Sequence, residues 1–515
     1  MTIARLTGDH TMPDPPRTIG EILVSATRRA PDAEALVCGE RRLSYREYLE
    51  RVCGLAFEFQ RRGLNGSRIA LLLNNSIEMA VASFAVHMAG AQAVLLNPAY
   101  TEREIGIILQ DAEPALLLFH KSSAHLIPSD IAGLMLMPIH AEDLDRLSAC
   151  PEDIATSGPD ALATLQYTGG TTGRPKGVNL THRAIATNIA QREALLPTIP
   201  NAERVLCVTP LFHSYATAMA LHLAAYCTGT LVIVSKYSAE TTLRIIESER
   251  ITLFPGSPTI FVGLMAHAKF ATTDFSSLRV CYSGSAALPQ DVLLRWEQAV
   301  HCKIYEGYGQ TEAGPVLTYN SPIKGAKPGS VGYALPQTTI EIVDSEDGRT
   351  VLNHASNGEI RARGPQIMSG YRNSPEETAA ALRDGWLYTG DIGSIEPDNT
   401  LTIRGRKKEL IIVSGFNVFP REIEDVLLTH PDVIEAAVIG QPDEYRGEIV
   451  CAFVVLAAGV ASDTQALHDY CTNRLARYKL PASITAIGSL PKTTVGKLDK
   501  VGLREIAFNS AAKKS

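Results

Sequence analysis

Short apolar runs separated by helical patterns dominate roughly the first 330 residues of the chain. The runs occupy residues 69–73, 93–96, 116–119, 161–165, 251–254 and 278–282. Apolar strands without alternation, separated by helices, are typical of a parallel sheet that is covered on both faces. The helix expected over residues 290–300 has one apolar side, formed by Val292, Leu293, Trp296 and Val300. We therefore expect a large N-terminal lobe of two stacked α/β sheet layers.

The pattern changes near Pro328. Apolar and polar residues alternate at 339–343 and 359–363, with a turn signal at Asp347-Gly348. This alternation predicts antiparallel hairpins and a small β-barrel.

A last unit begins after Arg404, with a helix entered by Pro420 and apolar strands at 436–439 and 450–456. The expected fold class is α/β, with the layered lobe and barrel in residues 18–404 and a small mobile α+β domain in residues 405–515. Residues 1–17 are polar and Pro-rich, and we expect a loose tail there.

Residues 211–235 contain no Asp, Glu, Lys or Arg, which is long enough to raise a membrane span. The window also contains His213, His222 and Gly229, and such polar groups are costly in a bilayer. We interpret it as a buried helix to about Tyr226, a turn at Gly229 and a strand at 231–234, and expect no membrane span.

Composition narrows the class of protein. The chain has 515 residues, of which 45% are hydrophobic and 20% charged, as in ordinary globular proteins. A net charge of -7 gives no reason to expect nucleic acid binding. Nine cysteines stand singly without a C-x-x-C pair, which argues against a zinc site or a disulfide framework. With no visible signal peptide, we expect a cytoplasmic protein.

Candidate chemistry begins at residues 167–177, Tyr-Thr-Gly-Gly-Thr-Thr-Gly-Arg-Pro-Lys-Gly. Glycines let backbone N–H groups approach a ligand, threonine hydroxyls add donors and possible magnesium ligands, and Arg174 and Lys176 add positive charge. This mixture predicts a cradle for a polyphosphate. The alternative is a surface turn rich in Gly and Thr. The spacing is not that of the common P-loop.

The loop resembles the phosphate loop of the adenylate-forming superfamily, which includes acyl-CoA synthetases, luciferases and the adenylation domains of peptide synthetases. The variant here is most similar to the fatty-acyl-CoA ligases. Four further stretches match in the order that the family uses, at residues 305–312, 388–391, 405–424 and 490–497. The resemblance covers about residues 19–504.

The residues of these stretches support the resemblance by themselves. Residues 305–312 carry two glycines and two tyrosines, fit for a flat ring, and Glu312 is a hard oxygen ligand for magnesium. A capped helix start with an exposed Glu would look the same. Asp391 follows a glycine and suits two ribose hydroxyls, although such an Asp is usually a turn residue.

The resemblance implies nucleotide contacts across the chain. The ATP or AMP ligands are expected to be Thr168, Gly169, Gly170, Thr171, Thr172, Gly173, Lys176, Ser285, Ala286, Glu306, Gly307, Tyr308, Gly309, Thr311, Asp391, Arg406 and Lys497. Magnesium is expected at Thr172 and Glu312.

The resemblance also implies roles in the reaction. Lys497, Lys176 and His213 are expected to be catalytic, although composition alone would make Lys497 a surface lysine. The domain hinge is expected at Lys408, and Ser414 and Gly415 are expected to border the CoA channel.

The acyl pocket is expected to contain His213, Tyr215, Met219, Ser283 and Gly284. A single His in an apolar segment is more often a core residue. Here Pro210-Leu211-Phe212-His213 resembles the gate segment between the ATP and acyl pockets of CoA ligases. Adenylation domains for amino acids carry an Asp at that position, so His213 counts against an amino-acid substrate.

The expected function is an ATP-dependent acid–CoA ligase that forms acyl-AMP and then acyl-CoA, with release of pyrophosphate and AMP. A medium- or long-chain fatty acid is the expected substrate, and an aryl or alicyclic acid is the alternative. Loading of a carrier protein, or a nucleotide-binding regulator without catalysis, remain further hypotheses. Expected partners are the acid, ATP, CoA and Mg²⁺, with a lysine acetyltransferase and deacetylase acting on Lys497. The sequence leaves monomer and homodimer open.

Overall fold

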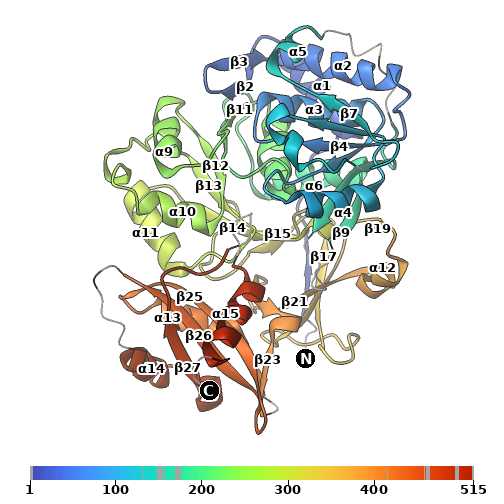
Figure 1. The fold of residues 1–515 in the computed structure, drawn as a ribbon. Helices are drawn as coiled ribbons and strands as arrows, with labels where there is room; N and C mark the ends of the chain where they lie inside the picture. The colour runs from blue at the N-terminus through green and yellow to red at the C-terminus, as the bar shows by residue number, and fades with distance from the viewer. Residues whose placement is uncertain are drawn as a thin grey trace.

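The computed structural model describes residues 4–129, 131–147, 154, 157–168, 175–414, 416–457, 459, 464–492 and 498–512. The described strands form four β-sheets (Figure 1). Two large sheets and the helices around them make the N-terminal lobe, and the two smaller sheets lie at its lower end in the view of Figure 1.

The first large sheet carries the predicted phosphate loop. Its described strands are, in order, β19 (Gly370–Tyr371), β9 (Lys176–Thr181), β8 (Leu162–Thr168), β5 (Gln92–Leu95), β4 (Arg68–Leu72), β6 (Leu116–Phe119) and β7 (Met135–Pro138). Strands β5, β4, β6 and β7 are parallel to their neighbours. In β4, Ile69 and Leu71 belong to one core and Ala70 and Leu72 to another, so both faces are buried as the apolar run predicts.

One strand of the second large sheet leads into the predicted nucleotide motif at residues 305–312. Its described strands are, in order, β16 (Tyr333–Ala334), β15 (Thr318–Tyr319), β14 (Ile304–Tyr308), β13 (Val280–Ser283), β12 (Leu253–Gly256), β10 (Arg204–Cys207), β11 (Thr230–Ile233), β2 (Glu34–Cys38) and β3 (Arg41–Ser44). Helices α9 (Ala239–Ser248), α10 (Pro258–Met265) and α11 (Gln290–Val300) pack on one face. The predicted limits of α11 and its apolar side are confirmed.

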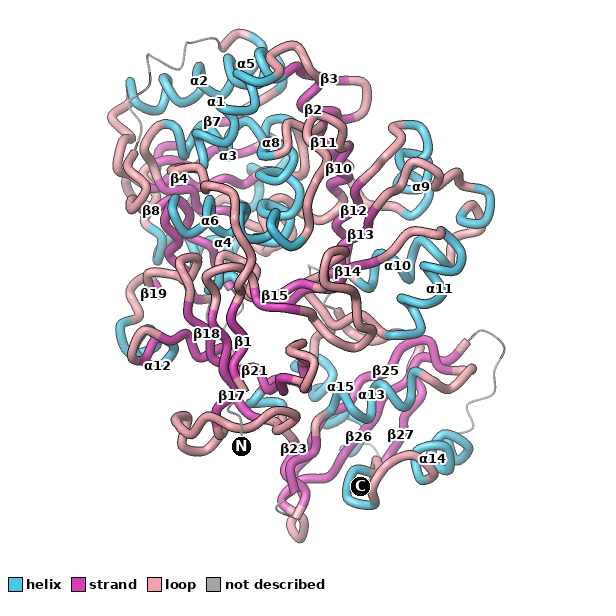
Figure 2. Tube along the Cα trace, turned by 180° about the vertical axis from the view of Figure 1, so that it is seen from behind, coloured by secondary structure: helices cyan, strands magenta, loops and turns pink. Residues whose placement is uncertain are grey.

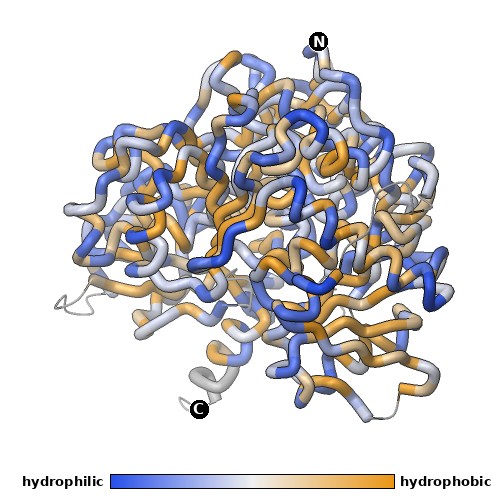
Figure 3. The backbone as a smooth tube through the Cα atoms, turned by 90° about the horizontal axis from the view of Figure 1, so that it is seen from above, coloured by the Kyte–Doolittle hydropathy of each residue, from blue (hydrophilic) through white to orange (hydrophobic). Residues whose placement is uncertain are grey.

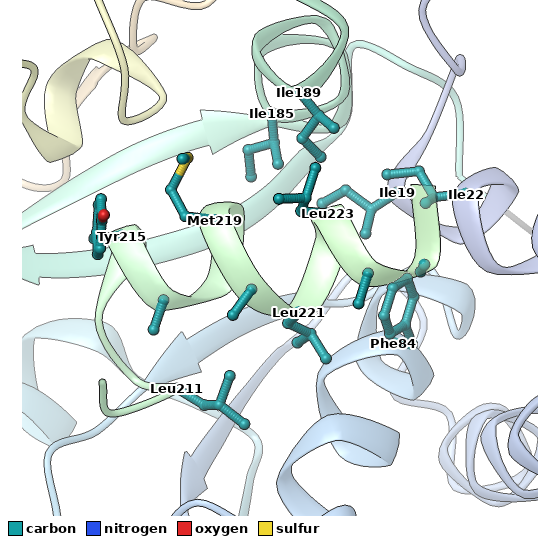
Figure 4. Packing of buried hydrophobic residues seen from close by; sticks show 14 of the residues in the cluster. Ile19, Ile22, Phe84, Ile185, Ile189, Leu211, Tyr215, Met219, Leu221 and Leu223 are labelled. Atoms are coloured by element: carbon teal, nitrogen blue, oxygen red, sulfur yellow. The ribbon is translucent and has the colours of Figure 1, made fainter. Parts of the chain in front are cut away.

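The central core lies between the two large sheets. It is filled by α1 (Ile19–Arg29), α2 (Tyr45–Arg61), α3 (Ile77–Met88), α6 (His182–Leu195) and the helical segment 214–226. Every residue of α3 is buried. The segment 214–226 crosses this core (Figure 4), which explains why it carries no charge. Helix α4 (Glu102–Ala112) covers the outer face of the first sheet.

The third sheet is antiparallel. Its described strands are β1 (Arg5–Thr7), β17 (Thr339–Val343), β18 (Gly358–Arg363), β21 (Trp386–Ile395) and β20 (Leu382–Arg383), with β22 (Leu401–Arg406) also paired to β21. The predicted hairpins are confirmed. Among the described strands β1 lies at one edge, and β20 and β22 both pair with the outer side of β21. Leu401 of β22 also exchanges backbone hydrogen bonds with Val331 and Gly332.

The C-terminal unit has its own sheet and core. Its described strands are β24 (Phe416–Val418), β23 (Ile411–Val413), β26 (Gly447–Leu456), β25 (Val433–Asp443) and β27 (Ser483–Ala486), with helices α13 (Pro420–Leu428), α14 (Thr464–Thr472) and α15 (Lys500–Ala512). The expected helix at Pro420 and both expected strands are present. Figure 2 shows this unit beside β14 and β21 from behind. Figure 3 colours the backbone by hydropathy and shows apolar and hydrophilic stretches alternating along the chain.

The predicted loose N-terminal tail is wrong at one short strand. Residues 5–7 are not part of a loose tail, because they form β1 and pair with β17. Leu6 is buried, and the Arg5 guanidinium forms an ion pair with Glu341. Three residues are too few for a periodic signal, so only the tertiary partner reveals this strand. Strand β22 ends at Arg406, close to the predicted domain boundary at residue 404.

Candidate active site

The predicted phosphate loop joins two strands at one edge of the first sheet. Thr168 ends β8 and Lys176 begins β9, and the two residues are opposite each other in the antiparallel register. Residues 169–174 lie outside the described residues, and with them Gly169, Gly170, Thr171, Thr172 and Gly173. The strands on both sides therefore fix where the loop leaves and re-enters the sheet.

Lys176 lies among acidic and aromatic side chains. Its Nζ is 2.7 Å from Glu377 Oε1, a residue of α12 (Pro375–Ala381). The same ammonium is 5.3 Å from the centre of the Tyr371 ring. The Tyr371 hydroxyl donates to Glu312 Oε1 at 2.8 Å. A continuous series of contacts thus joins the end of the phosphate loop to the predicted magnesium ligand.

Glu312 lies in the short 3₁₀ helix η5 (Thr311–Ala313), which follows β14. Its backbone carbonyl accepts from Met368 N at 2.9 Å. The neighbouring Thr311 Oγ1 is 3.1 Å from Ser214 Oγ. Because Ser214 begins the helical segment of the expected acyl pocket, this contact connects the nucleotide and acyl sides directly.

Asp391 stands within β21 rather than in a turn. It is 4% exposed, and its carboxylate accepts from the Tyr308 hydroxyl at 2.6 Å. Arg406 Nε lies 2.8 Å from the other carboxylate oxygen, and the two residues are register partners of β21 and β22. Burial raises the pKa of Asp391, while Arg406 and Tyr308 oppose that shift. Three predicted nucleotide ligands are therefore in contact.

Glu306 is buried within the predicted nucleotide motif at residues 305–312. Its carboxylate accepts from Leu288 N at 2.7 Å, and burial raises its pKa to about 7. The next residue, Gly307, packs under a ring, because a Cβ there would lie 2.5 Å from Tyr319. Gly309 is exposed beyond the end of β14.

The end of β13 and the small-residue loop after it each carry a hydroxyl that is buried without a partner among the described residues, those of Ser283 and Ser285. Ser285 also has a φ of 69°, a conformation that non-glycine residues rarely adopt and that is often found at functional sites. Ala286 is exposed beside it. Buried hydroxyls of this kind call for a ligand or a water molecule.

The expected acyl residues lie along the helical segment and at the end of β13 and the loop after it. His213 accepts from Tyr215 N at 3.2 Å and so caps the helical segment. The Tyr215 ring packs on Gly284, where a Cβ would come within 2.5 Å of it. Met219 is 1% exposed and points to the side of Ile185, opposite Leu211 (Figure 4).

The helical segment carries a feature that the sequence does not reveal. Its described parts are α7 (Ser214–Ala216), the π-helix η3 (Thr217–His222) and α8 (Leu223–Tyr226). A π turn inside a helix is frequently found at functional sites. No residue type encodes it, so hydropathy could predict the buried helix but not its winding.

The C-terminal unit adds the expected hinge. Lys408 is exposed within the 3₁₀ turn η6 (Lys407–Glu409). Partial burial and the adjacent Arg406 lower the pKa of Lys408. Lys500 Nζ lies 3.1 Å from Glu409 and 3.2 Å from Glu424, so α15 is tied to both the turn and α13.

The residues expected to border the CoA channel, and the lysine expected to be catalytic, lie at or beyond the limits of the described residues. Ser414 has a φ of 50°, and its N–H donates to Arg446 O at 2.7 Å. Gly415 and Lys497 lie outside the described residues. Lys492 and Leu498, which flank the Lys497 loop, form a β-bridge.

The donor set fits magnesium. Among the described residues no group of three His, Cys, Asp or Glu side chains could hold a metal alone. Magnesium bound with ATP needs only one or two carboxylates, because phosphates and water complete its shell. The Glu312 carboxylate, fixed by Tyr371, meets that need.

Sequence reasoning missed Tyr371, Glu377 and Ser214, which touch predicted ligands. Tyr371 and Glu377 lie outside the predicted motifs. The pairing of β19 with β9 brings Tyr371 to Lys176, and α12 carries Glu377 to the same ammonium. The one available sequence signal for this segment is the Gly-Tyr pair, which indicates a strand end, followed by Pro375 and two glutamates, which indicate a helix start.

Among the residues that the structure describes, no helix is both long and apolar enough to cross a membrane.

Comparisons with known proteins agree with this geometry. A family model described as "AMP-binding enzyme" matches residues 23–372, and one described as "AMP-binding enzyme C-terminal domain" matches residues 422–497. A long-chain-fatty-acid–CoA ligase of Bacillus subtilis is 36% identical over 95% of this chain and 94% of its own. A feruloyl-CoA synthase of Amycolatopsis is 35% identical over 94% and 98%.

Solved structures agree as well. The crystal structure of an anthranilate CoA ligase in complex with anthranoyl-AMP superposes with a TM-score of 0.90, at 27% identity, over 97% of this chain and 99% of that one. The match extends through both units and both sides of the site. The chain therefore belongs to the AMP-binding enzyme family, and it is an adenylate-forming acyl-CoA synthetase.

Proposed function

We propose that the enzyme converts a medium- or long-chain fatty acid to its acyl-CoA. The observation that carries this choice of acid is the buried helical segment 214–226, which has no charged side chain to pair with a polar substrate. The 36% identity to a long-chain-fatty-acid–CoA ligase supports it. His213, Tyr215, Met219, Ser283 and Gly284 are the proposed acyl residues.

In the first step a carboxylate oxygen attacks the α-phosphorus of ATP, the bond to the β-phosphate breaks, and acyl-AMP and pyrophosphate form. Negative charge develops on the phosphates, so cations stabilise the transition state. We assign that role to Lys176 and Lys497. Asp391 would accept from the ribose hydroxyls, with Arg406 beside it.

Magnesium supplies further charge neutralisation to ATP when it is bound. Glu312 and Thr172 are the residues that would hold it. The remaining proposed nucleotide ligands are those of the phosphate loop, the Ser285–Ala286 pair and residues 306–311.

In the second step the CoA thiolate attacks the acyl carbon and AMP leaves. One site serves both steps if the C-terminal unit rotates, with residues 18–404 and 405–515 as the two bodies and Lys408 as the pivot. The Ser414–Gly415 turn would then border the CoA channel. The ion pairs of Lys500 with Glu409 and Glu424 would hold α15 to the moving unit.

Substitution of the pivot tests this rotation. Lys408→Pro fixes φ near roughly -65°, so we expect acyl-AMP to form but thioester formation to fail, as read from the two half-reactions. Lys407→Ala on the neighbouring residue, which pairs with Glu359, is the matched control and should keep both steps. Equal loss of both steps in folded Lys408→Pro protein would contradict the pivot.

Regulation and location belong to the same proposal. The enzyme would work in the cytoplasm, and acetylation of Lys497 would remove the charge that adenylation needs. Protein acetylated at this residue should lose adenylation and regain it after deacetylation.

An aryl acid is the second candidate. It is favoured by the aromatic wall that Tyr215 forms against Gly284, with Tyr282 and Tyr319 behind it. The 35% identity to a feruloyl-CoA synthase also supports it.

A panel of acids distinguishes the candidates. Fatty, aryl, alicyclic and α-amino acids are offered with ATP and either CoA or a carrier protein, and products are identified by mass. We expect fatty acyl-CoA. Comparable turnover of an α-amino acid would contradict the apolar pocket, and acyl-AMP that transfers only to carrier protein would contradict CoA as acceptor.

A further inference from the structure

The segment formed by β19 and α12 lies against the phosphate-loop hairpin. β19 pairs with β9 in antiparallel register, with Tyr371 opposite Val178. On its other side, Tyr371 N donates to Thr378 Oγ1 of α12 at 2.9 Å. The backbone of Tyr371 is therefore held on both sides, at a fixed position relative to Lys176 on the same strand pair.

The Tyr371 side chain contacts both kinds of charge in the site. Its hydroxyl donates to Glu312 Oε1 at 2.8 Å, and its ring face lies 5.3 Å from Lys176 Nζ. Glu377, on α12 of the same segment, lies 2.7 Å from that ammonium. One half-buried tyrosine thus sets the spacing between a proposed metal ligand and a proposed phosphate cation.

The acceptor distinguishes Tyr371 from tyrosines with a purely structural bond. Tyr333 and Tyr470 donate to backbone carbonyls, of Lys324 and Thr429. Tyr371 instead donates to a carboxylate, which forms stronger hydrogen bonds.

We propose that Tyr371 is a positioning residue for magnesium, which holds the Glu312 carboxylate in the orientation that the metal of MgATP requires. The inference rests on the proposed function, in which Glu312 is the metal ligand. Outer-shell partners of metal ligands typically change metal affinity or activity by 10–100-fold when they are removed. Nothing in the role requires Tyr371 to touch the reacting atoms.

Tyr371→Phe tests the proposal, because it keeps the ring beneath Lys176 and removes only the donor. We expect the Mg²⁺ concentration for half-maximal acyl-AMP formation to rise by about tenfold or more, with recovery at saturating Mg²⁺. The thioester half-reaction, started from supplied acyl-AMP and CoA, should be unchanged, which also shows that the variant is folded. Tyr333→Phe is the matched control and should shift neither quantity.

Metal binding is measured independently of turnover. Mn²⁺ is titrated by electron paramagnetic resonance into protein that holds α,β-methylene-ATP, an analogue that cannot be cleaved at the α-phosphorus. Mn²⁺ should bind to Tyr371→Phe about tenfold more weakly than to the wild type. Unchanged Mn²⁺ binding would overturn the proposal.

A double-mutant cycle with Glu312→Gln isolates the route of the effect. If Tyr371 acts through Glu312, Tyr371→Phe should add nothing to the loss of Mn²⁺ affinity in the Glu312→Gln background. An equal loss in both backgrounds would overturn the proposal while leaving Glu312 as a ligand. If Glu312→Gln itself leaves Mn²⁺ binding unchanged, the metal assignment of the proposed function is wrong, and this inference is wrong with it.

Discussion

The proposed nucleotide side and the proposed acyl side of the site are built from different contacts. On the proposed nucleotide side, Tyr308 and Arg406 contact the buried Asp391 carboxylate at 2.6 and 2.8 Å. On the acyl side, the Tyr215 ring packs on Gly284 and Met219 is enclosed by apolar side chains. Charged and hydrogen-bonding groups dominate the first side, and packing of apolar side chains dominates the second. Substitutions on one side should therefore change the kinetics of ATP, and substitutions on the other the kinetics of the acid.

Loss of Lys497, the proposed catalytic lysine, should give the largest effect. Lys497→Ala removes a charge that is used only while the phosphates react, so adenylation should decrease by roughly 10²–10³. Conversion of supplied acyl-AMP and CoA to thioester should continue. Lys492→Ala, which removes a surface ion pair with Glu435, is the control. A loss confined to the second step would contradict the assignment.

Asp391→Asn should affect ATP without affecting the acid. It keeps an acceptor for Tyr308 but removes the charge that pairs with Arg406. Because hydrogen bonds to a charged group contribute roughly 1.5–3 kcal/mol, we expect the KM for ATP to rise about tenfold or more. Steady-state kinetics at saturating acid would measure this rise. A matching rise in the KM for the acid would mean that the two sides are not separable.

Gly284→Ala should do the reverse. Its Cβ would lie 2.5 Å from the Tyr215 ring, so the ring must move, and overpacking of this kind costs roughly 1–3 kcal/mol. We expect kcat/KM for the preferred acid to decrease about tenfold, with the KM for ATP unchanged. Gly158→Ala, where the added Cβ meets no atom within 4 Å, is the control. An unchanged ranking of acids would remove Gly284 from the acyl pocket.

The smallest effect concerns stability and pH. Burial raises the pKa of Glu306 from 4.5 to about 7, so folding favours its protonated form. An acid of this kind adds stability below its unfolded pKa, and the contribution is lost as pH rises from 4.5 to about 7. Glu306→Gln should therefore increase Tm by a few degrees at pH 8 and little at pH 5. The same increase at both pH values would contradict the shift.

The sequence predicts the buried strands and the motif residues, but not the contacts between them. The apolar runs predict the buried strands, because a strand inside an α/β lobe is apolar on both faces, as Ile69 and Ala70 show in β4. The motifs also mark Asp391 and Arg406, which the structure brings into contact. The contact itself follows from the register of β21 and β22, which no local pattern determines.

Other features depend on tertiary structure alone. Strand β1 is visible only beside β17, and Tyr371 reaches Glu312 only because β19 pairs with β9. The strand order of the third sheet likewise depends on which strands pair. The π turn at residues 217–222 reflects packing within the central core. These are long-range contacts, and hydropathy and motif spacing report local ones.

One isotope measurement tests the central claim most directly. A fatty acid labelled with oxygen-18 in its carboxylate is incubated with the enzyme, ATP and CoA, and the nucleotide products are analysed by mass. If the carboxylate attacks the α-phosphorus and CoA then displaces AMP, one labelled oxygen must leave in AMP and none in pyrophosphate. Label in pyrophosphate or in inorganic phosphate, or unlabelled AMP together with acyl-CoA, would contradict an acyl-AMP intermediate.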